Sequence, residues 1–170
     1  MASNGNKKIS NITTGTSINK GACVVIIRTD WNAAILDELE KGCRKILSKS
    51  GVKNIQTISV PGAVEIPFAI KSYWEAVKYR DDKPSAFIVL GCIIKGDTPH
   101  FDYVSKIAAD GVLQLNLTLP VPTIFGVLTV LNEQQAQERL GGKHGHKGEE
   151  AAYTALSMIN LVKSFQVRNS

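Results

Sequence analysis

Residues 96–100 combine residue types that could bind a phosphate and transfer a proton. The segment reads Gly-Asp-Thr-Pro-His. Thr98 can cap a helix, and Pro99 suits the first helical position because its missing N–H would have no partner there. A helix N-terminus attracts anions, and His100 in the first turn could exchange protons near neutral pH. A capped helix with a surface histidine explains the same residues, and the charge of Asp97 opposes an anion.

Two further side chains follow apolar stretches at positions that a ligand could reach. Glu65 comes shortly after Pro61-Gly62 and could accept hydrogen bonds from the N–H groups of a ligand. Trp31 directly follows the first apolar stretch, where its ring could stack on a flat heterocycle. A solvated loop carboxylate and an ordinarily packed tryptophan are the plain alternatives, and the residues alone leave them open.

Cysteine and histidine residues suggest two other chemistries. Cys92, His100 and Asp102 could form a nucleophile, its base and an orienting carboxylate, although a small buried cysteine at a strand end is more common. His144 and His146 form a His-x-His pair in a glycine-rich link, but no third ligand has an obvious spacing. We therefore expect a flexible polar loop there and no metal site. Neither GxGxxG nor GxxxxGK[ST] occurs, which favours catalysis without a cofactor.

The apolar pattern predicts the elements that must position these residues. Nearly unbroken apolar runs are typical of strands buried on both faces of a parallel sheet, and a more polar run suits an edge strand. Between the runs, apolar residues recur with a period near 3.6, as in helices packed by one face. We therefore expect an α/β fold: a three-layer, doubly wound, mostly parallel four-stranded sheet with helices on both faces, flavodoxin-like, whose ligands bind beyond the carboxyl ends of the strands. The predicted strands cover residues 22–27, 54–60 (the edge strand), 86–94 and 121–130.

Length and composition place the chain among ordinary globular domains. Its 170 residues are 44% hydrophobic and 21% charged, so collagen-like and wholly disordered classes are excluded. We expect one domain, residues 21–166, between a polar tail over residues 1–20 and a short tail over residues 167–170. A short strand is expected near residues 9–14.

Charge and cysteine content limit the partners and the compartment. The net charge is +5, but Lys41, Lys45 and Lys49 recur at helical spacing without aromatic residues that could stack on bases, so no nucleic acid is expected as a partner. No apolar run is long enough to cross a membrane, and the first residues lack the apolar centre of a signal peptide. The three cysteines, Cys23, Cys43 and Cys92, are an odd and widely spaced set without a CxxC pair, which argues against a disulfide framework or a structural zinc site and favours a reducing compartment. We therefore expect a cytoplasmic protein with no membrane partner.

Five segments of the chain share the motifs of one known family, in order and spacing. They are VPGAVEIPFAIK (60–71), GCIIKGDTPHFDYV (91–104), VPTIFGVLT (121–129), QAQERLG (135–141) and KGEEAAYTAL (147–156). From about residue 20 to about residue 166 the chain resembles the lumazine synthase family. At two matching positions it departs from many members, which carry Phe where Trp31 stands and Asn where His146 stands.

The resemblance implies an enzyme and a reaction. Family members are transferases that condense 5-amino-6-(D-ribitylamino)uracil with 3,4-dihydroxy-2-butanone 4-phosphate, without a cofactor. The products are 6,7-dimethyl-8-ribityllumazine, phosphate and water, in the penultimate step of riboflavin biosynthesis. Two small-molecule substrates are therefore expected as partners. Two alternatives stay open: a non-catalytic flavin- or pterin-binding homologue, and a hydrolase that uses Cys92 and His100.

The resemblance also implies a role for each matching residue. His100 would transfer protons, Trp31 would stack on the pyrimidine, and Arg139 would clamp the phosphate, for which its planar guanidinium is suited. Phe125, expected at the end of the fourth strand, would reach into the site of a neighbouring subunit, and Lys147 would give support. The expected contacts are Trp31, Ala63, Val64, Glu65, Cys92, Ile93, Ile94 and Phe125 for the ribitylaminouracil, with Cys92, Ile93 and Ile94 acting through their backbone, and Asp97, Thr98 and Arg139 for the butanone phosphate.

Assembly is a further implication of the resemblance. Family members form pentamers, and some pack twelve pentamers into an icosahedral shell of 60 subunits when the link between the last two helices is short. Residues 141–148 are a short link, so we expect a homo-oligomer that reaches the 60-subunit shell. The strand near residues 9–14 would cover a neighbour's exposed edge strand. Some relatives enclose riboflavin synthase, which is therefore a candidate partner.

Overall fold

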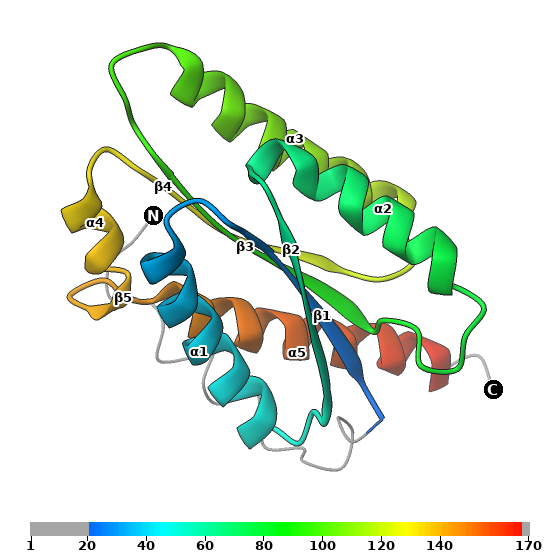
Figure 1. The fold of residues 1–170 in the computed structure, drawn as a ribbon. Coiled ribbons are helices and arrows are strands. Elements are labelled where there is room, and N and C mark those ends of the chain that lie inside the picture. Colours follow the sequence, from blue (N-terminus) through cyan, green and yellow to red (C-terminus); the bar gives the residue numbers. More distant parts are fainter. Residues whose placement is uncertain (1–20, 168–170) are drawn as a thin grey trace.

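The computed structural model describes residues 21–167, which form a three-layer α/β fold (Figure 1). The four strands of the main sheet run parallel in the order β2-β1-β3-β4, with helices on both faces, as predicted. The strands are β1 (Cys23–Thr29), β2 (Asn54–Val60), β3 (Ala86–Ile94) and β4 (Thr123–Val130). The long helices are α1 (Ala33–Lys49) and α5 (Lys147–Val167) on one face, and α2 (Ile66–Val77) and α3 (His100–Thr118) on the other.

Some predictions fall on the two ends of the chain. The tail over residues 1–20, its short strand near residues 9–14 and the last three residues, 168–170, lie outside the described residues. Within residues 21–167, no helix combines the length and the apolar character that crossing a membrane requires.

Burial on both faces explains the unbroken apolar runs of the central strands. In β1, Val24 and Ile26 pack in the core beneath α1 and α5, whereas Val25 and Ile27 pack in the core beneath α2 and α3. All four side chains are fully buried. Because successive side chains of a strand point to opposite faces, a strand covered on both sides must be apolar throughout.

The polar character of β2 follows from its place at the sheet edge, which confirms that prediction. Thr57 donates to Glu40 of α1 at 2.6 Å, and Arg44 in turn donates to Thr57 at 2.6 Å. Burial alone would raise the pKa of Glu40, but hydrogen bonds from Thr57, Arg44 and Arg28 hold it below its ordinary value. The carboxylate therefore stays charged at neutral pH and ties the edge strand to α1.

The segment between β4 and α5 differs from the prediction. It forms a short helix, α4 (Glu133–Gln137), and a two-stranded antiparallel hairpin, β5 (Leu140–Gly142) and β6 (Gly145–His146). The expectation of a flexible polar loop around the His-x-His pair was therefore wrong. Two glycines with positive φ, Gly141 at 106° and Gly145 at 77°, allow the tight reversal, because other L-residues rarely adopt that conformation. Figure 1 shows α4 and the hairpin beyond the carboxyl end of β4.

Candidate active site

The loops that follow β1, β2 and β3 meet at the carboxyl edge of the sheet. The backbone N–H of Asp30, after β1, donates to the carbonyl of Val60 at the end of β2 at 2.9 Å. The side chain of Asn32 donates to the carbonyl of Cys92 in β3 at 3.0 Å. These bonds hold the loop after β1 against the ends of β2 and β3, in the region where open α/β sheets bind ligands. We define the strand-end site as the following residues of these loops, of the end of β3 and of the start of α3: Trp31, Ala63, Val64, Glu65, Cys92, Ile93, Ile94, Asp97, Thr98 and His100.

Asn32 is a structural residue of this site that the sequence reasoning missed. Its backbone angles, φ 60° and ψ 45°, lie in the left-handed region. Among the described residues it is the only one other than glycine with a positive φ. Asparagine tolerates this conformation better than most residues. Its amide occupies one lone pair of the Cys92 carbonyl, a group whose backbone was expected to face the pyrimidine. The signal available in the sequence was an asparagine directly between a strand and a helix.

Trp31 and Glu65 both approach Gly62. A Cβ placed on Gly62 would lie 3.0 Å from Oε2 of Glu65 and 3.9 Å from Cδ1 of Trp31. The Trp31 side chain is 73% exposed, so a large aromatic face is open to a ligand. Val64 is exposed beside it, whereas Ala63 is buried in the short 3₁₀ helix η2 (Ala63–Glu65) that precedes α2. The arrangement offers a flat apolar surface next to a carboxylate acceptor.

His100 is the first residue of α3 and is exposed, together with Asp97 and Thr98. The predicted capping role of Thr98 was wrong: Pro99 takes the N-cap position, and no side chain among the described residues caps this helix. The turn closes through the backbone, where the N–H of Asp102 donates to the carbonyl of Pro99 at 3.0 Å. Without a side-chain cap, the remaining N–H groups of the first turn can donate to an anion, next to an imidazole that can move protons.

Phe125 does not lie where the sequence reasoning placed it. It is the third residue of β4 and pairs with Val89 in the middle of β3, so the expectation that it lies at the strand's end was wrong. Five residues, or about 16 Å, separate it from the carboxyl end of β4. The apolar run from 121 to 130 has no period that could locate a residue along the strand. Phe125 is therefore remote from the strand-end site of its own chain.

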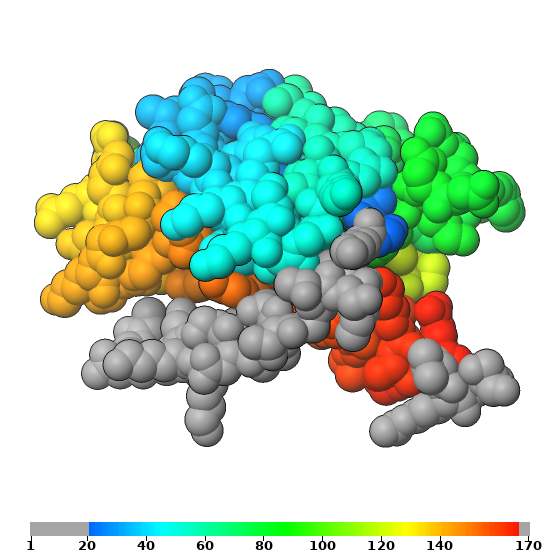
Figure 2. Space-filling model, turned by 90° about the horizontal axis from the view of Figure 1, so that it is seen from below, coloured from blue at the N-terminus to red at the C-terminus, as the bar shows by residue number. Residues whose placement is uncertain are grey.

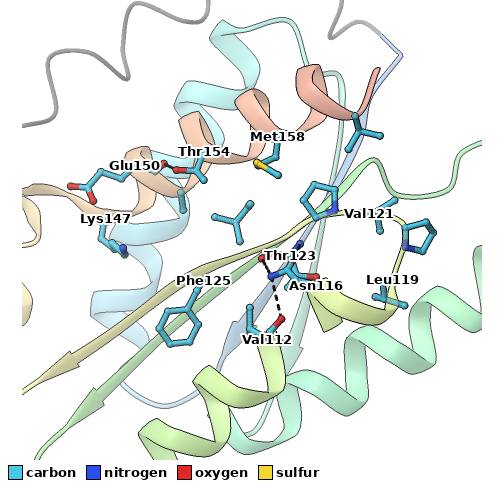
Figure 3. A pocket seen from close by; sticks show the side chains of 15 residues that line it. Val112, Asn116, Leu119, Val121, Thr123, Phe125, Lys147, Glu150, Thr154 and Met158 are labelled. Carbon is cyan, nitrogen blue, oxygen red and sulfur yellow. Dashed lines mark hydrogen bonds between the residues drawn. The ribbon is translucent and has the colours of Figure 1, made fainter. Parts of the chain in front are cut away.

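A groove of about 710 Å³ opens along the free edge of β4, between α3 and α5. Figure 3 shows Phe125, Lys147 and Glu150 around one end of it, and Met158 further along. Toward the start of β4, Asn116 pairs with the backbone of Thr123, donating at 2.9 Å and accepting at 2.8 Å. A side chain thus takes the place of a neighbouring strand at the start of this sheet edge.

Arg139 is held beside this groove by a set of charged contacts. Its Nη2 lies 2.8 Å from Oε2 of Glu150, and its Nη1 donates to the carbonyl of His144. Its own carbonyl accepts from the backbone N–H of Lys147 at 2.9 Å. Burial lowers the pKa of Lys147; the charge of Arg139 lowers it further, and that of Glu150 opposes both. We call Phe125, Arg139, Lys147 and Glu150 the edge cluster.

Glu150 belongs to this cluster although the sequence reasoning did not single it out. It stands in the first turn of α5, eleven residues after Arg139, and the hairpin brings the two side chains together. Its Oε1 is buried without a hydrogen-bond partner among the described residues. Only the fold of the hairpin reveals this pair, because no periodic pattern relates the two positions.

The environment of Cys92 argues against a nucleophilic thiol. The side chain is 5% exposed, and burial, with a smaller effect from the charge of Glu133, raises its pKa to about 11. At pH 7 a thiol with such a pKa is ionised in about one molecule in ten thousand. Because the thiolate is the reactive form, the Cys92 hydrolase is the weaker alternative.

The His-x-His pair does not form a metal site in the structure. His144 Nε2 lies 3.4 Å from Oε2 of Glu138, whereas the His146 ring lies against Gly42 of α1. Within residues 21–167, no three His, Cys, Asp or Glu side chains gather closely enough to hold a metal ion.

Comparison with known proteins relates this architecture to one family. The profile of the family described as 6,7-dimethyl-8-ribityllumazine synthase matches residues 21–163. The chain is 44% identical over 138 residues to the 6,7-dimethyl-8-ribityllumazine synthase of Parabacteroides distasonis, covering 80% of this chain and 83% of that protein. It is 44% identical over 141 residues to that of Bacteroides fragilis, covering 82% and 95%. For the enzyme of Xanthomonas campestris pv. campestris the identity is 40% over 141 residues, covering 82% and 88%.

Proposed function

This chain belongs to the 6,7-dimethyl-8-ribityllumazine synthase family, and from that premise we propose that its reaction takes place between two copies of the chain. The protein is a lumazine synthase of riboflavin biosynthesis. In our proposal the strand-end site of one copy meets the edge cluster of a neighbouring copy, and each copy alone lacks part of the pocket.

The position of Phe125 is the observation that carries this proposal. Its ring lines an open groove about 16 Å along β4 from the strand-end edge. Lys147 lines the same end of that groove, and Arg139 is bonded to its backbone. A neighbouring chain that covers the β4 edge would bring this aromatic ring and these cations onto a second strand-end site.

The strand-end site would bind the ribitylaminouracil. Trp31 stacks on the pyrimidine with its exposed face, and the carboxylate of Glu65 accepts from N–H groups of the ligand. Ala63 and Val64 contact the ring and the ribityl chain. The backbone of β3 at Cys92, Ile93 and Ile94 forms the floor of this pocket, and Phe125 of the neighbour closes it.

The start of α3 would bind the phosphate of the second substrate. The turn at Asp97 and Thr98 presents the N–H groups that precede and begin α3. Asp97 carries a negative charge that opposes the phosphate, so cations are needed to balance it. Arg139 supplies two parallel N–H donors, and Lys147 supplies a further positive charge. For this, Arg139 must share its guanidinium between Glu150 and the substrate.

In the reaction that this site supports, His100 would be the proton-transfer residue. The 5-amino group of the pyrimidine adds to the ketone of the butanone phosphate, and one water leaves. Phosphate then leaves with the electron pair of its C–O bond, and closure of the second ring releases a second water. Each step moves protons, which suits an exposed imidazole at the phosphate end, and much of the rate comes from holding two reactants together.

We also propose the assembly and compartment that the sequence suggested. Residues 21–166 would form one domain that assembles into pentamers and, because the hairpin link is short, into a shell of 60 subunits. Riboflavin synthase would be an enclosed partner. All three cysteines are free and buried, which supports a cytoplasmic, reducing location.

A direct assay tests the proposed substrates. The purified protein is mixed with both substrates, and lumazine fluorescence and phosphate release are followed together. We expect the two products in equal amounts. Binding of the pyrimidine without release of either product would contradict the proposal and favour the flavin- or pterin-binding homologue.

A further inference from the structure

The ring of His146 lies against a glycine in the middle of α1. Gly42 is buried within this helix, and a Cβ placed on it would lie 2.5 Å from Nε2 and 2.7 Å from Nδ1 of His146. The imidazole therefore occupies the space in which another residue at position 42 would hold its side chain. A glycine inside a helix makes the helix less stable than an alanine would. The close approach of the imidazole explains why a glycine nevertheless stands at this position.

A second glycine brings the start of α5 onto the same helix. A Cβ placed on Gly148 would lie 2.8 Å from the carbonyl carbon of Leu39 and 3.1 Å from its Cα. His146 and Gly148 flank Lys147, so this lysine is fixed to α1 on both sides. Figure 2 shows the yellow-to-orange segment that contains the hairpin beside α1, which is blue to cyan.

His146 also bonds to the helix that it precedes. Its Nδ1 accepts from the backbone N–H of Glu149 at 3.4 Å. The bond spans three residues, as in a side chain that caps a helix N-terminus. Only an unprotonated Nδ1 can accept it. On the outside, Lys45 of α1 pairs with Glu149 at 3.0 Å, which adds a second tie between the two helices.

The backbone connects His146 to the cations of the edge cluster. His146 pairs with Leu140 in the hairpin, and Leu140 directly follows Arg139. The N–H of Lys147 donates to the carbonyl of Arg139 at 2.9 Å. A shift of His146 would therefore move Arg139 and Lys147 together.

We propose that His146 is a positioning residue for the phosphate-bearing substrate. Docked on Gly42 and bonded to the N–H of Glu149, it holds Arg139 and Lys147 at the spacing that binds the phosphate. It does not touch either substrate. The inference rests on the phosphate-binding roles proposed above for Arg139 and Lys147.

Two substitutions of His146 separate the hydrogen bond from the bulk of the ring. His146→Leu keeps an apolar volume over Gly42 but cannot accept from Glu149, whereas the side-chain oxygen of His146→Asn can. We expect H146L to raise the KM for the butanone phosphate about fivefold, which corresponds to about 1 kcal/mol, the usual effect of a lost cap. The KM for the pyrimidine should stay within about twofold, and H146N should have wild-type KM values for both substrates.

A double-mutant cycle with Gly42 tests the docking without any substrate. Gly42→Ala should lower the urea midpoint of the wild-type protein, because its methyl group would overlap the imidazole. In an H146A background the same change should leave the midpoint unchanged or raise it, because alanine is the better helix former. An equal loss of stability in both backgrounds would overturn the docking.

The kinetic outcomes distinguish this inference from the proposed function. If H146L leaves both KM values unchanged, or raises both equally, His146 does not position the phosphate site and the inference is overturned. Arg139→Ala is measured beside it. If R139A raises the KM for the butanone phosphate while H146L does not, the inference alone fails. If R139A has no effect either, the assignment of the phosphate site fails.

Discussion

The strand-end site and the edge cluster are built in opposite ways. The strand-end residues sit in loops set by their own strands, and Trp31 and His100 are exposed. In the edge cluster, Arg139 is paired with Glu150, and Lys147 is half-buried beside both. The aromatic ring and the imidazole of the first region are open to solvent, whereas the guanidinium of the second is already engaged by Glu150.

This difference between the two regions indicates how each of them can contribute free energy to substrate binding. An exposed aromatic ring gains its stacking partner only when a ligand or another chain covers it. A guanidinium already paired with Glu150 would have to share its hydrogen bonds with a bound phosphate. Its contribution to binding is therefore the free energy gained from the phosphate minus that lost from the pair with Glu150. Substitutions in the two regions should therefore affect different kinetic constants.

The largest effect is expected from His100→Ala in the strand-end site. Removal of the proposed proton-transfer group should lower kcat by about a hundredfold or more. The urea midpoint should not change, because His100 is exposed. Steady-state kinetics check this, with His144→Ala as a control histidine outside the strand-end site. A kcat within about twofold of the wild type would remove His100 from the mechanism.

In the edge cluster, Arg139→Ala should mainly weaken binding of the phosphorylated substrate. Loss of a bidentate charged contact should raise the KM for the butanone phosphate about ten- to a hundredfold. Arg80→Ala is the matched control, because this arginine forms an exposed pair with Asp82. A KM shifted only for the pyrimidine would show that the two regions do not divide the substrates as proposed.

A smaller effect is expected from Trp31→Ala. Loss of stacking should raise the KM for the pyrimidine about tenfold, within the usual range for an aromatic side chain on a base. Trp31→Phe should recover most of that loss. The urea midpoint should be unchanged because the side chain is 73% exposed. Tyr79→Ala, at 90% exposure, serves as the control aromatic residue; an equal KM shift in both variants would refute specific stacking.

The smallest kinetic effect is expected from Cys92→Ala. The thiol is buried and its pKa is about 11, so its loss should leave kcat within about twofold. The small cavity left by the thiol should lower the free energy of unfolding by about 1 kcal/mol. Cys43→Ala, at another buried cysteine, is the control and should lower it by a similar amount. Abolished activity with an intact fold would revive the hydrolase reading.

The sequence predicted the layers of this fold because strands buried on both faces are apolar throughout, whereas helices packed by one face have a period near 3.6. Residues 54–60 were identified as an edge strand from their polarity, and β2 does lie at the edge. The expectation that Phe125 lies at the strand's end conflicted with the predicted strand over residues 121–130, and the structure has it as the third residue of β4. Residues 141–148 were mistaken for a loop because glycines at positive φ serve hairpins as readily as loops.

The candidate site was predictable to the extent that local sequence builds it. Trp31 and Glu65 were placed correctly after their strands, because strand ends can be read from the apolar pattern. The pair of Arg139 and Glu150, and the contact of His146 with Gly42, depend on how the hairpin packs on α1. Such contacts arise from tertiary structure and have no periodic signature.

Mixed assembly of two impaired variants, assayed at a butanone phosphate concentration far below the raised KM of R139A, tests most directly whether the two regions meet between copies. His100→Ala and Arg139→Ala subunits are unfolded, mixed in equal amounts and refolded, and mass spectrometry verifies that the oligomers are mixed. If each site combines the strand-end site of one copy with the edge cluster of the next, random mixing should restore about a quarter of the wild-type activity. If mixed oligomers form and are no more active under these conditions than the separate variants, each site lies within one chain and the account is contradicted.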